Sequence, residues 1–493
     1  MNYLGVDIGT FETKGVIVSA TGEIVASAAR PHRMQVPQPG WAEHDAETDW
    51  WGDFVDMTRR MLAESRIAPA SIAGIGTSGI GPCMLPVNAN GTPLMNAVLY
   101  GVDTRAAAEI GEMTRAAGNE SIIERCGNAL TSQSVGPKIL WLKRHRPEVF
   151  ARTRKFLNST SFLVHRLTGK FAVDHYTACG STPFYRADTN SWDDALAPGI
   201  ISLDAMPDLL WTTEIAGHVT KAASQATGLA AGTPVIAGTV DAAAEAVSVG
   251  VSHSGELMLM YGSTIFIIVI ADGRSRDPRL WYAPWLFEGQ HAAMAGLATS
   301  GTLTHWFRDN FAREMSGAGA IAQLAAEAET SPPGAKGLLV LPYFSGERTP
   351  LHDPHAKGLI FGLDLTHNRG DLFRAVLEGI AHGTRHAFET FATSGLQPTT
   401  IYAVGGGAKN RVWSQATSDI CGIPQVLRQK TMGASYGDAF LAAIAVGGAK
   451  REDIETWNPR VSAIMPRAEL KPHYDERHAV FRALYPATRQ WMQ

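Results

Sequence analysis

The chain has 493 residues, of which 45% are hydrophobic and 18% are charged. This length exceeds what one hydrophobic core supports, so we expect a globular protein with two large domains. The formal net charge of -4, from 43 basic and 47 acidic residues, excludes a bulk electrostatic attraction to nucleic acid or to an anionic membrane.

Residues 3–18 predict a β-hairpin with a turn suited to phosphate. An apolar strand ends at Asp7, a turn holds Thr10 and Thr13, and a second apolar strand follows. The backbone N–H groups of such a turn, together with Lys14, suit phosphate oxygens, and Asp7 can hold Mg²⁺ through water. The alternative interpretation is an ordinary hairpin, because turn residues are commonly polar.

Helices and strands alternate through the rest of the first half. Apolar spacing predicts a helix over 47–64, a strand over 72–77, and helices over 137–145 and 159–167. The stretch from Gly74 to Gly79 matches the dinucleotide fingerprint literally. That fingerprint needs a helix at its last glycine, which the prolines that follow would block. The sequence therefore disfavours a Rossmann dehydrogenase.

Asp241 lies where an apolar strand meets a helix of small residues, within 234–250. An acidic residue at this place commonly caps the helix, because its carboxylate binds free N–H groups. The functional interpretation is a general base that accepts the proton of a substrate hydroxyl as that hydroxyl attacks the γ-phosphate of ATP. Both interpretations suit the local sequence.

Residues 255–270 repeat the first hairpin: a strand, a turn of Gly262, Ser263 and Thr264, and a second strand. Two similar halves that each offer such a turn would hold a nucleotide in the cleft between them. This arrangement resembles the ATPase fold of actin, hexokinase and Hsp70, an α/β fold of duplicated ribonuclease H-like domains. Asp241 lies between the two hairpins, which favours its catalytic interpretation.

The second half continues the α/β alternation. Its pattern predicts a strand over 338–342, a helix over 371–393, a strand over 400–404 and a helix over 434–446. We expect a sugar-binding and first phosphate-binding domain over residues 1–245. A nucleotide-binding domain is expected over residues 246–493.

Two segments of the second half make a family recognisable. Residues 358–379 fit the long C-terminal signature of the FGGY carbohydrate kinases, and the loop over 345–357 is similar to the loop of that family. The N-terminal signature around 138–141 fits only in part, because Gln133 and Val135 replace the residues of the pattern. The chain thus resembles the FGGY carbohydrate kinases over nearly its whole length, and most of all their xylulokinase-like branch.

The resemblance implies an ATP-dependent kinase that uses Mg²⁺, with Asp7 as the water-mediated metal ligand and Asp241 as the catalytic base. It also implies the residues that bind the nucleotide. The phosphate residues are Thr10, Thr13, Lys14, Gly262, Ser263 and Thr264. The adenosine residues are Gly405, Gly406, Gly407, Ala408 and Asn410, with Gly301 beginning a helix beside the nucleotide. A glycine triplet after a strand lets the backbone approach a flat base closely.

The sugar is expected in the first domain. Trp41 belongs to a segment similar to the Gly-Trp-x-Glu segment of the family, and its ring can stack on a sugar. The alternative is a tryptophan that covers the edge of a sheet. Asp103 and Arg105 match an Asp-x-Arg segment, and together they can hydrogen-bond vicinal hydroxyls. The alternative for this pair is an ion pair without a ligand.

One segment of the expected sugar site departs from the family. We expect Ser78, Gly81 and Pro82 to line the sugar pocket, but Ile80-Gly81-Pro82 replaces the Gln-Met-His of xylulokinases and the Arg-Glu pair of glycerol kinases. Tyr100 stands where xylulokinases have a Trp-Asn pair. Because a site built for one hydroxyl rejects analogues strongly, D-xylulose and glycerol in their usual poses are expected to be poor substrates.

The predicted function is therefore ATP-dependent phosphorylation of a terminal hydroxyl of an open-chain sugar or polyol, for example a xylulose- or ribulose-like pentulose. Two alternatives are a catalytically silent, sugar-responsive binding protein on the same fold and an actin- or Hsp70-like ATPase. The presence of both Asp7 and Asp241 argues against the first alternative. The sugar-side segments argue against the second.

The four cysteines, Cys83, Cys126, Cys179 and Cys421, have no paired spacing. This distribution favours reduced core thiols over disulfides or a zinc site.

Charged residues interrupt the first apolar stretch, so no signal peptide is expected, and the longest apolar run, 257–271, is too short to span a bilayer. We expect a cytoplasmic enzyme whose partner is a small-molecule sugar or polyol, with no nucleic-acid or membrane partner. The sequence leaves room for a homodimer.

Overall fold

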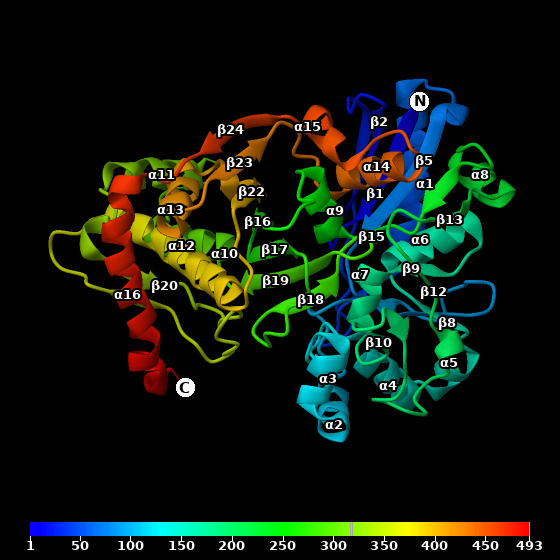
Figure 1. Ribbon diagram of the computed structural model, residues 1–493, viewed down its shortest axis with the longest axis horizontal. Coiled ribbons are helices and arrows are strands. Elements are labelled where there is room, and N and C mark those ends of the chain that lie inside the picture. Colours follow the sequence, from blue (N-terminus) through cyan, green and yellow to red (C-terminus); the bar gives the residue numbers. More distant parts are fainter. Residues whose placement is uncertain (316, 318, 493) are drawn as a thin grey trace.

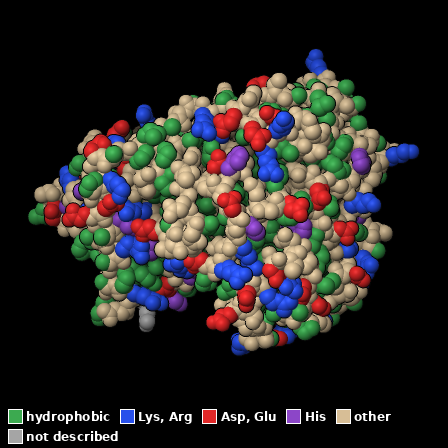
Figure 2. Space-filling view, in the orientation of Figure 1, with side chains coloured by type: hydrophobic (Ala, Val, Ile, Leu, Met, Phe, Trp, Pro, Cys, Tyr) green, Lys and Arg blue, Asp and Glu red, His purple; other side chains and the backbone are tan. Residues whose placement is uncertain are grey.

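Two α/β bodies lie side by side in the computed structural model, which describes residues 1–315, 317 and 319–492 (Figure 1). Each body contains a seven-stranded sheet. We call residues 1–245 lobe I and residues 246–493 lobe II. The space-filling view shows an indentation between the two bodies along its lower edge (Figure 2). Within the described residues, no helix combines the length and the apolar character that crossing a membrane requires.

The sheet of lobe I has the strand order β13-β14-β5-β1-β2-β3, and β15 also pairs with β5. Its strands are β1 (Asn2–Ile8), β2 (Glu12–Ser19), β3 (Ile24–Pro31), β5 (Ile72–Gly79), β13 (Ile215–His218), β14 (Pro234–Ile236) and β15 (Thr239–Val240). The antiparallel pair β1–β2 confirms the first predicted hairpin. Because β1 and β15 both run parallel to β5, the carboxyl ends of these three strands meet at one edge. Asp7, Ser78 and Thr239 lie in register there.

The sheet of lobe II has the order β18-β19-β17-β16-β22-β23-β24. Its strands are β16 (Glu256–Tyr261), β17 (Ile265–Ala271), β18 (Trp281–Pro284), β19 (His291–Leu297), β22 (Thr400–Val404), β23 (Gln425–Arg428) and β24 (Arg460–Ile464). The antiparallel pair β16–β17 confirms the second predicted hairpin. Since β22 runs parallel to β16, the turn after β22 lies at the same edge as the turn of this hairpin.

Most predicted helices form within a few residues of their expected bounds. The helices are α1 (Asp53–Ser65), α2 (Ala107–Ala117), α3 (Asn119–Cys126), α4 (Val135–His145), α5 (Pro147–Arg152), α6 (Ser159–Thr168), α7 (His175–Ala178), α8 (Lys221–Thr227), α9 (Asp241–Ser248), α10 (Gly301–Phe311), α11 (Ala320–Thr330), α12 (Arg369–Thr393), α13 (Arg411–Cys421), α14 (Ala434–Ala445), α15 (Ile454–Trp457) and α16 (Lys471–Thr488). The helix predicted over 47–64 is instead a π-helical segment over Ala46–Gly52 that continues into α1. Asp45 caps this segment, because its side chain accepts bonds from the N–H groups of Glu47 and Thr48.

Short strands complete the two bodies outside the main sheets. They are β4 (Glu43–His44), β6 (Leu85–Val87), β7 (Ala97–Val98), β8 (Lys155–Leu157), β9 (Ala172–Asp174), β10 (Tyr185–Arg186), β11 (Ser191–Trp192), β12 (Asp208–Leu210), β20 (Leu339–Leu341) and β21 (Leu359–Phe361). The strand β20 lies within the predicted strand over 338–342.

Helix α14 belongs to the second half of the sequence but packs on the sheet of lobe I (Figure 1). Glycines make this contact possible. A Cβ atom on Gly5 of β1 would lie 1.9 Å from the carbonyl oxygen of Ser435, and one on Gly76 of β5 would lie 2.2 Å from that of Asp438. Residues 434–445 therefore pack on lobe I although they follow most strands of the second sheet in the sequence. The domain boundary between residues 245 and 246 stays a prediction.

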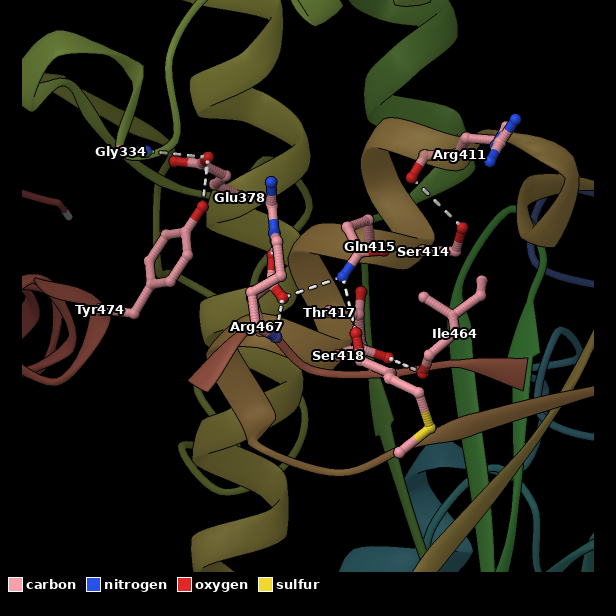
Figure 3. A network of polar contacts seen from close by, with 12 residues as sticks. Gly334, Glu378, Arg411, Ser414, Gln415, Thr417, Ser418, Ile464, Arg467 and Tyr474 are labelled. Atoms are coloured by element: carbon pink, nitrogen blue, oxygen red, sulfur yellow. Dashed lines mark hydrogen bonds and ion pairs between the residues drawn. The ribbon is translucent and has the colours of Figure 1, made fainter. Parts of the chain in front are cut away.

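Buried polar contacts hold α12, α13 and α16 together behind the sheet of lobe II (Figure 3). The carboxylate of Glu378, which is 3% exposed, accepts hydrogen bonds from Arg374, from the N–H of Gly334 and from the hydroxyl of Tyr474 at 2.8, 3.1 and 2.8 Å. Arg467 pairs with the buried carboxylate of Asp419 at 2.6 Å. Satisfied buried polar networks of this kind fix a single arrangement of helices.

We predict that Gly5→Ala destabilises the protein, because the added methyl group would collide with backbone of α14 rather than with a flexible side chain. Overpacking of this kind costs about 1–3 kcal/mol or more, so the melting temperature should fall clearly. Gly273→Ala is the matched control, since no atom lies within 4 Å of the position of its Cβ. Equal melting temperatures for the two variants would contradict the direct packing of α14 on β1.

Candidate active site

Each hairpin turn has two backbone N–H groups free to bind an anion. In the first turn these belong to Thr10 and Phe11, and in the second turn to Ser263 and Thr264. None of the four donates a hydrogen bond to another residue in the part of the chain that the structure describes. Lys14 adds a half-exposed ammonium group beside the first turn. Successive free N–H groups beside a cation form an anion-binding cradle.

Acidic side chains gather at the edge where β1, β5 and β15 end. The hydroxyl of Ser78 lies 2.7 Å from the carboxylate of Asp438 and 3.3 Å from that of Asp7. Asp241, the first residue of α9, follows β15 directly, and Glu245 lies one helical turn further along α9. The same edge thus brings together three carboxylates from lobe I and one from α14.

Burial raises the pKa values of all four acidic groups, and the charge of a neighbouring carboxylate adds to the shift for Asp241, Glu245 and Asp438. Burial raises the pKa of Asp7 to about 6, although the bond from Ser78 and the charge of Lys14 oppose the shift. Burial and the charge of Asp7 raise the pKa of Glu245 to about 7. Burial, then the charge of Asp7, raises the pKa of Asp241 well above its usual value. The pKa of Asp438 is raised for the same two reasons, with a further contribution from Asp241.

This cluster suits a divalent cation held mainly through water. Oδ1 of Asp438 is buried and has no hydrogen-bond partner among the described residues, which leaves an acceptor available to a cation or to its water. No group of three or more acidic, histidine or cysteine side chains within the described residues forms a ready-made metal site. Mg²⁺ commonly keeps several waters and binds one or two carboxylates together with substrate phosphates, so the residues present fit this ion.

A cavity of about 260 Å³ lies beside Asp241 and is lined by both lobes. Lobe I contributes Gly81 and Pro82, two of the residues predicted to line the sugar pocket. Lobe II contributes Phe266 and Trp281, whose ring centroids are 6.3 Å apart. Aromatic walls with a few polar groups are typical of sites for small organic ligands.

Tyr100 connects this cavity to the first phosphate turn. Its ring lines the cavity, and its hydroxyl lies 2.9 Å from Oγ1 of Thr10. The buried ammonium group of Lys138 donates hydrogen bonds to the carbonyl oxygens of Leu99 and Tyr100, which fixes the backbone of this segment. Burial lowers the pKa of Lys138 to about 8. A ligand in the cavity and an anion at the turn would therefore lie on either side of Tyr100.

Hydrogen bonds join the two lobes beside the cavity. The side chain of Asn128 in lobe I both donates to and accepts from the backbone of Tyr282 in lobe II, with both distances 2.8 Å. Both residues line the cavity. This paired contact holds β18 of lobe II against lobe I and closes one side of the cavity.

Three residues predicted to bind sugar lie apart from the cavity. The guanidinium group of Arg105 is fully buried and pairs with Asp103 and Glu43 at 2.8 and 2.9 Å. The same group lies 4.0 Å from the ring centroid of Trp41. None of these three residues lines the cavity beside Asp241, so their expected contact with a sugar stays a prediction. Asp103 and Arg105 do form the ion pair that the sequence offers as the alternative.

Two further residues predicted to bind ligand, Thr13 and Ser78, have hydroxyl groups that hydrogen-bond to carboxylates of the protein. Thr13 is fully buried and donates to Asp53 at 3.0 Å, so its expected contact with phosphate stays a prediction. The hydroxyl of Ser78 faces the acidic cluster rather than the cavity. Its expected contact with sugar also stays a prediction, since the hydroxyl donates to Asp438 in this structure.

The predicted adenosine segment lies directly against the second turn. A Cβ atom on Gly405 would lie 2.7 Å from the carbonyl oxygen of Tyr261, and one on Gly301 would lie 2.5 Å from that of Gly262. Asn410 caps α13 by accepting the N–H of Trp413 at 3.2 Å. The segment Gly405-Gly406-Gly407-Ala408 thus begins beside the turn that is expected to bind the phosphates.

Several lining residues have little signal in the sequence. Phe266 and Trp281 belong to apolar strands, where aromatic residues are ordinary. Arg348 lines the cavity as an exposed residue between the buried Glu347 and Thr349. Asp438 does carry a signal, because it is the single charged residue of α14, a helix of small and apolar residues.

Comparisons with known proteins agree with this geometry. Residues 2–248 match the model for the N-terminal domain of the FGGY family of carbohydrate kinases, and residues 257–446 match the model for its C-terminal domain. The chain is 30% identical to xylulose kinase of Escherichia coli (strain K12) over 491 residues, which covers 98% of each chain.

Solved structures share the fold. The crystal structure of xylulose kinase from Rhodospirillum rubrum has a TM-score of 0.94 and 31% identity, with 100% of both chains covered. Glycerol kinase of Plasmodium falciparum with ADP has a TM-score of 0.87 at 20% identity, covering 100% of this chain and 98% of that one. The predicted two-lobed α/β fold of the actin and hexokinase type is confirmed.

We predict that Asp438→Asn stabilises the protein increasingly as the pH rises. The pKa of Asp438 is higher in the folded than in the unfolded state, so the stability that its protonated form contributes is lost as the pH rises through the folded-state pKa. Asparagine keeps an acceptor for Ser78 but carries no charge. Melting temperatures should be similar in acid and higher for the variant above neutral pH.

The exposed Asp204→Asn is the control for this experiment, since it changes the net charge equally without relieving buried repulsion. A difference between Asp438→Asn and wild type that stays constant with pH would contradict the repulsion among the four carboxylates.

Proposed function

The chain belongs to the FGGY family of carbohydrate kinases, which are ATP-dependent phosphotransferases, and from this premise we propose that it phosphorylates a terminal hydroxyl of an open-chain pentulose. Asp241 is proposed as the general base. The observation that carries the proposal is the double position of Asp241: it lines the cavity and belongs to the acidic cluster at the end of β1. A general base must reach the substrate hydroxyl and lie close to the transferred phosphoryl group.

The nucleotide is proposed to lie between the two turns. The free N–H groups of both turns and Lys14 bind its phosphates, and the segment from Gly405 to Asn410 receives the adenosine. Asp7 would hold Mg²⁺ through water, and the ion would supply positive charge against the negative charge that develops during transfer. Because Asp438 and Glu245 repel Asp7 and Asp241, the protein favours a positive charge at this place before any nucleotide binds.

Proton transfer at Asp241 completes the proposed reaction. Oδ1 of Asp241 accepts the N–H of Ala242 at 2.7 Å, which orients the carboxylate at the start of α9. The second oxygen then accepts the proton of the terminal hydroxyl as that hydroxyl attacks the γ-phosphate in line. The lobe contact between Asn128 and Tyr282 excludes water from one side of the cavity, which limits hydrolysis of ATP.

The proposed substrate class rests on the relatives and on the cavity. Relatives of full length are xylulose kinases, which supports a pentulose. The cavity of this chain offers Gly81 and Pro82 at the place where those enzymes have other residues, so we propose a pentulose whose stereochemistry differs from that of D-xylulose. The cytoplasmic location and the homodimer stay predictions from the sequence.

Asp241→Asn is expected to lower kcat by about 10²- to 10⁴-fold, because the amide cannot accept the proton. Equilibrium binding of MgATP should change little, and the melting temperature should not fall, since burial disfavours the charged carboxylate. In the wild type, kcat/KM should fall with decreasing pH through a pKa above that of an ordinary carboxyl group. A variant with nearly wild-type kcat on its best sugar would sink the assignment of Asp241.

A screen of ketotetroses, ketopentoses, ketohexoses and polyols with ATP tests the substrate class. We expect a pentulose to give the highest kcat/KM, with D-xylulose and glycerol clearly lower. The triple variant Ile80→Gln, Gly81→Met, Pro82→His installs the residues of xylulokinases and should raise kcat/KM for D-xylulose relative to the best wild-type substrate. Comparable wild-type values for D-xylulose and the best sugar would refute the role given to this segment.

A further inference from the structure

The two phosphate turns have equivalent carbonyl contacts made by different chemical groups. In lobe II, the carbonyl oxygen of Gly262 accepts the N–H of Gly301 and the hydroxyl of Ser300, at 3.0 and 2.9 Å. The next carbonyl oxygen, of Ser263, accepts the N–H groups of Ser300 and Thr302, both at 3.1 Å. The start of α10 therefore holds two successive carbonyl groups of this turn.

In lobe I, two histidines take the place of that helix. Nε2 of His32 lies 3.0 Å from the carbonyl oxygen of Gly9, and Nε2 of His44 lies 3.1 Å from that of Thr10. Gly9 and Thr10 are the first two residues of their turn, as Gly262 and Ser263 are of theirs. Both histidine side chains are buried: His44 is 0% exposed and the side chain of His32 is 4% exposed.

We propose that His32 and His44 are positioning residues that aim the first phosphate turn at the nucleotide. The argument rests on the planarity of the peptide bond, which makes the C=O of one residue and the N–H of the next point in opposite directions. Holding the carbonyl of Gly9 directs the N–H of Thr10 away from His32. Holding the carbonyl of Thr10 directs the N–H of Phe11 away from His44. These are the two N–H groups of the turn that donate to no other described residue.

The contacts of His44 determine its tautomer. Nε1–H of Trp50 donates to Nδ1 of His44 at 3.1 Å, so Nδ1 is the acceptor and the proton lies on Nε2, facing Thr10. Burial, together with the charge of the nearby His32, lowers the pKa of His44 to about 4. His44 is therefore a neutral imidazole that donates to the turn throughout the physiological pH range.

His32 is held in its charged form. Its Nδ1 lies 2.9 Å from the carboxylate of Asp53, and its Nε2 faces the carbonyl of Gly9. Both partners are acceptors, so both ring nitrogens carry protons. Burial by itself lowers the pKa of His32, but the bonds to Asp53 and to Gly9, with the charges of Asp53 and Asp49, outweigh it and raise the pKa.

Other charged groups around His32 fix the same arrangement. Arg30 of β3 pairs with Asp53 at 2.8 Å and with Asp56 of α1 at 3.2 Å. The hydroxyl of Thr13 on β2 donates to Asp53, and the ring of His44 packs edge-on against His32 at 4.9 Å between centroids. On β2 the charged neighbours Glu12 and Lys14 pair with each other at the surface, 3.5 Å apart.

The positioning role of the two histidines depends on one part of the proposed function, namely that the first turn binds phosphate. Its test is therefore direct equilibrium binding of MgATP to the sugar-free enzyme, with His32→Leu, His44→Leu and the corresponding glutamine variants. Leucine removes the donor and leaves a buried carbonyl unpaired, which should weaken MgATP binding about 10- to 100-fold. Glutamine carries an N–H donor near the position of Nε2, so His44→Gln should recover most of the affinity.

His165→Leu is the matched control, because His165 also faces a backbone carbonyl, of Asn90, but lies away from the turn. It should lose stability like the other leucine variants and keep its affinity for MgATP. The KM for sugar should change less than about twofold in all variants.

Wild-type affinity for MgATP should also weaken as the pH rises through the raised pKa of His32, and His32→Gln should lose this dependence.

The outcomes separate the two proposals. If the wild type binds MgATP but phosphorylates no sugar, the proposed function fails while the leucine variants still decide the role of the histidines. If His32→Leu and His44→Leu bind MgATP as tightly as His165→Leu does, the positioning role is overturned. If the wild type itself does not bind MgATP, both proposals are overturned.

Discussion

The site depends on electrostatic repulsion among Asp7, Asp241, Glu245 and Asp438, which the fold forces together. Parallel strands bring Asp7 and Asp241 to one sheet edge, and α14 adds a carboxylate from the other end of the sequence. Buried like charges are costly unless a cation or a proton compensates them. The protein therefore stores an unfavourable interaction at the place where a nucleotide with its metal ion brings positive charge.

The surrounding structure keeps this arrangement in place. Glycines in β1 and β5 let α14 approach the sheet closely enough for Asp438 to meet Ser78. Lys138 and the Thr10 contact fix Tyr100 between the cavity and the first turn. Pre-organised dipoles and charges that need no rearrangement during reaction are the usual source of enzymatic rate enhancement. The packing of α14 and the contacts of Tyr100 thus both stiffen the sheet edge and place the groups proposed to act in the reaction.

Much of the fold could be predicted because its signals are local. Both hairpins, the long helix α12 and the strand β22 follow from apolar periodicity and turn residues. The sugar site was harder to predict, because a residue type at a motif position does not show which way its side chain points. Arg105 and Asp103 could contact a ligand or each other; in the structure they pair with each other, and Glu43 pairs with the same guanidinium group. Phe266 and Trp281 reach the cavity only through the packing of one lobe on the other.

The return of α14 to lobe I constrains how the chain folds during synthesis. Residues 434–445 cover strands β1 and β5, which leave the ribosome more than 350 residues earlier. Until then the glycine-lined face of that sheet has no helix to cover it, and a chain stopped at residue 245 would keep it exposed. Contacts so distant in sequence slow folding. The native packing of the lobe I sheet is therefore complete only after residues 434–445 have been synthesised.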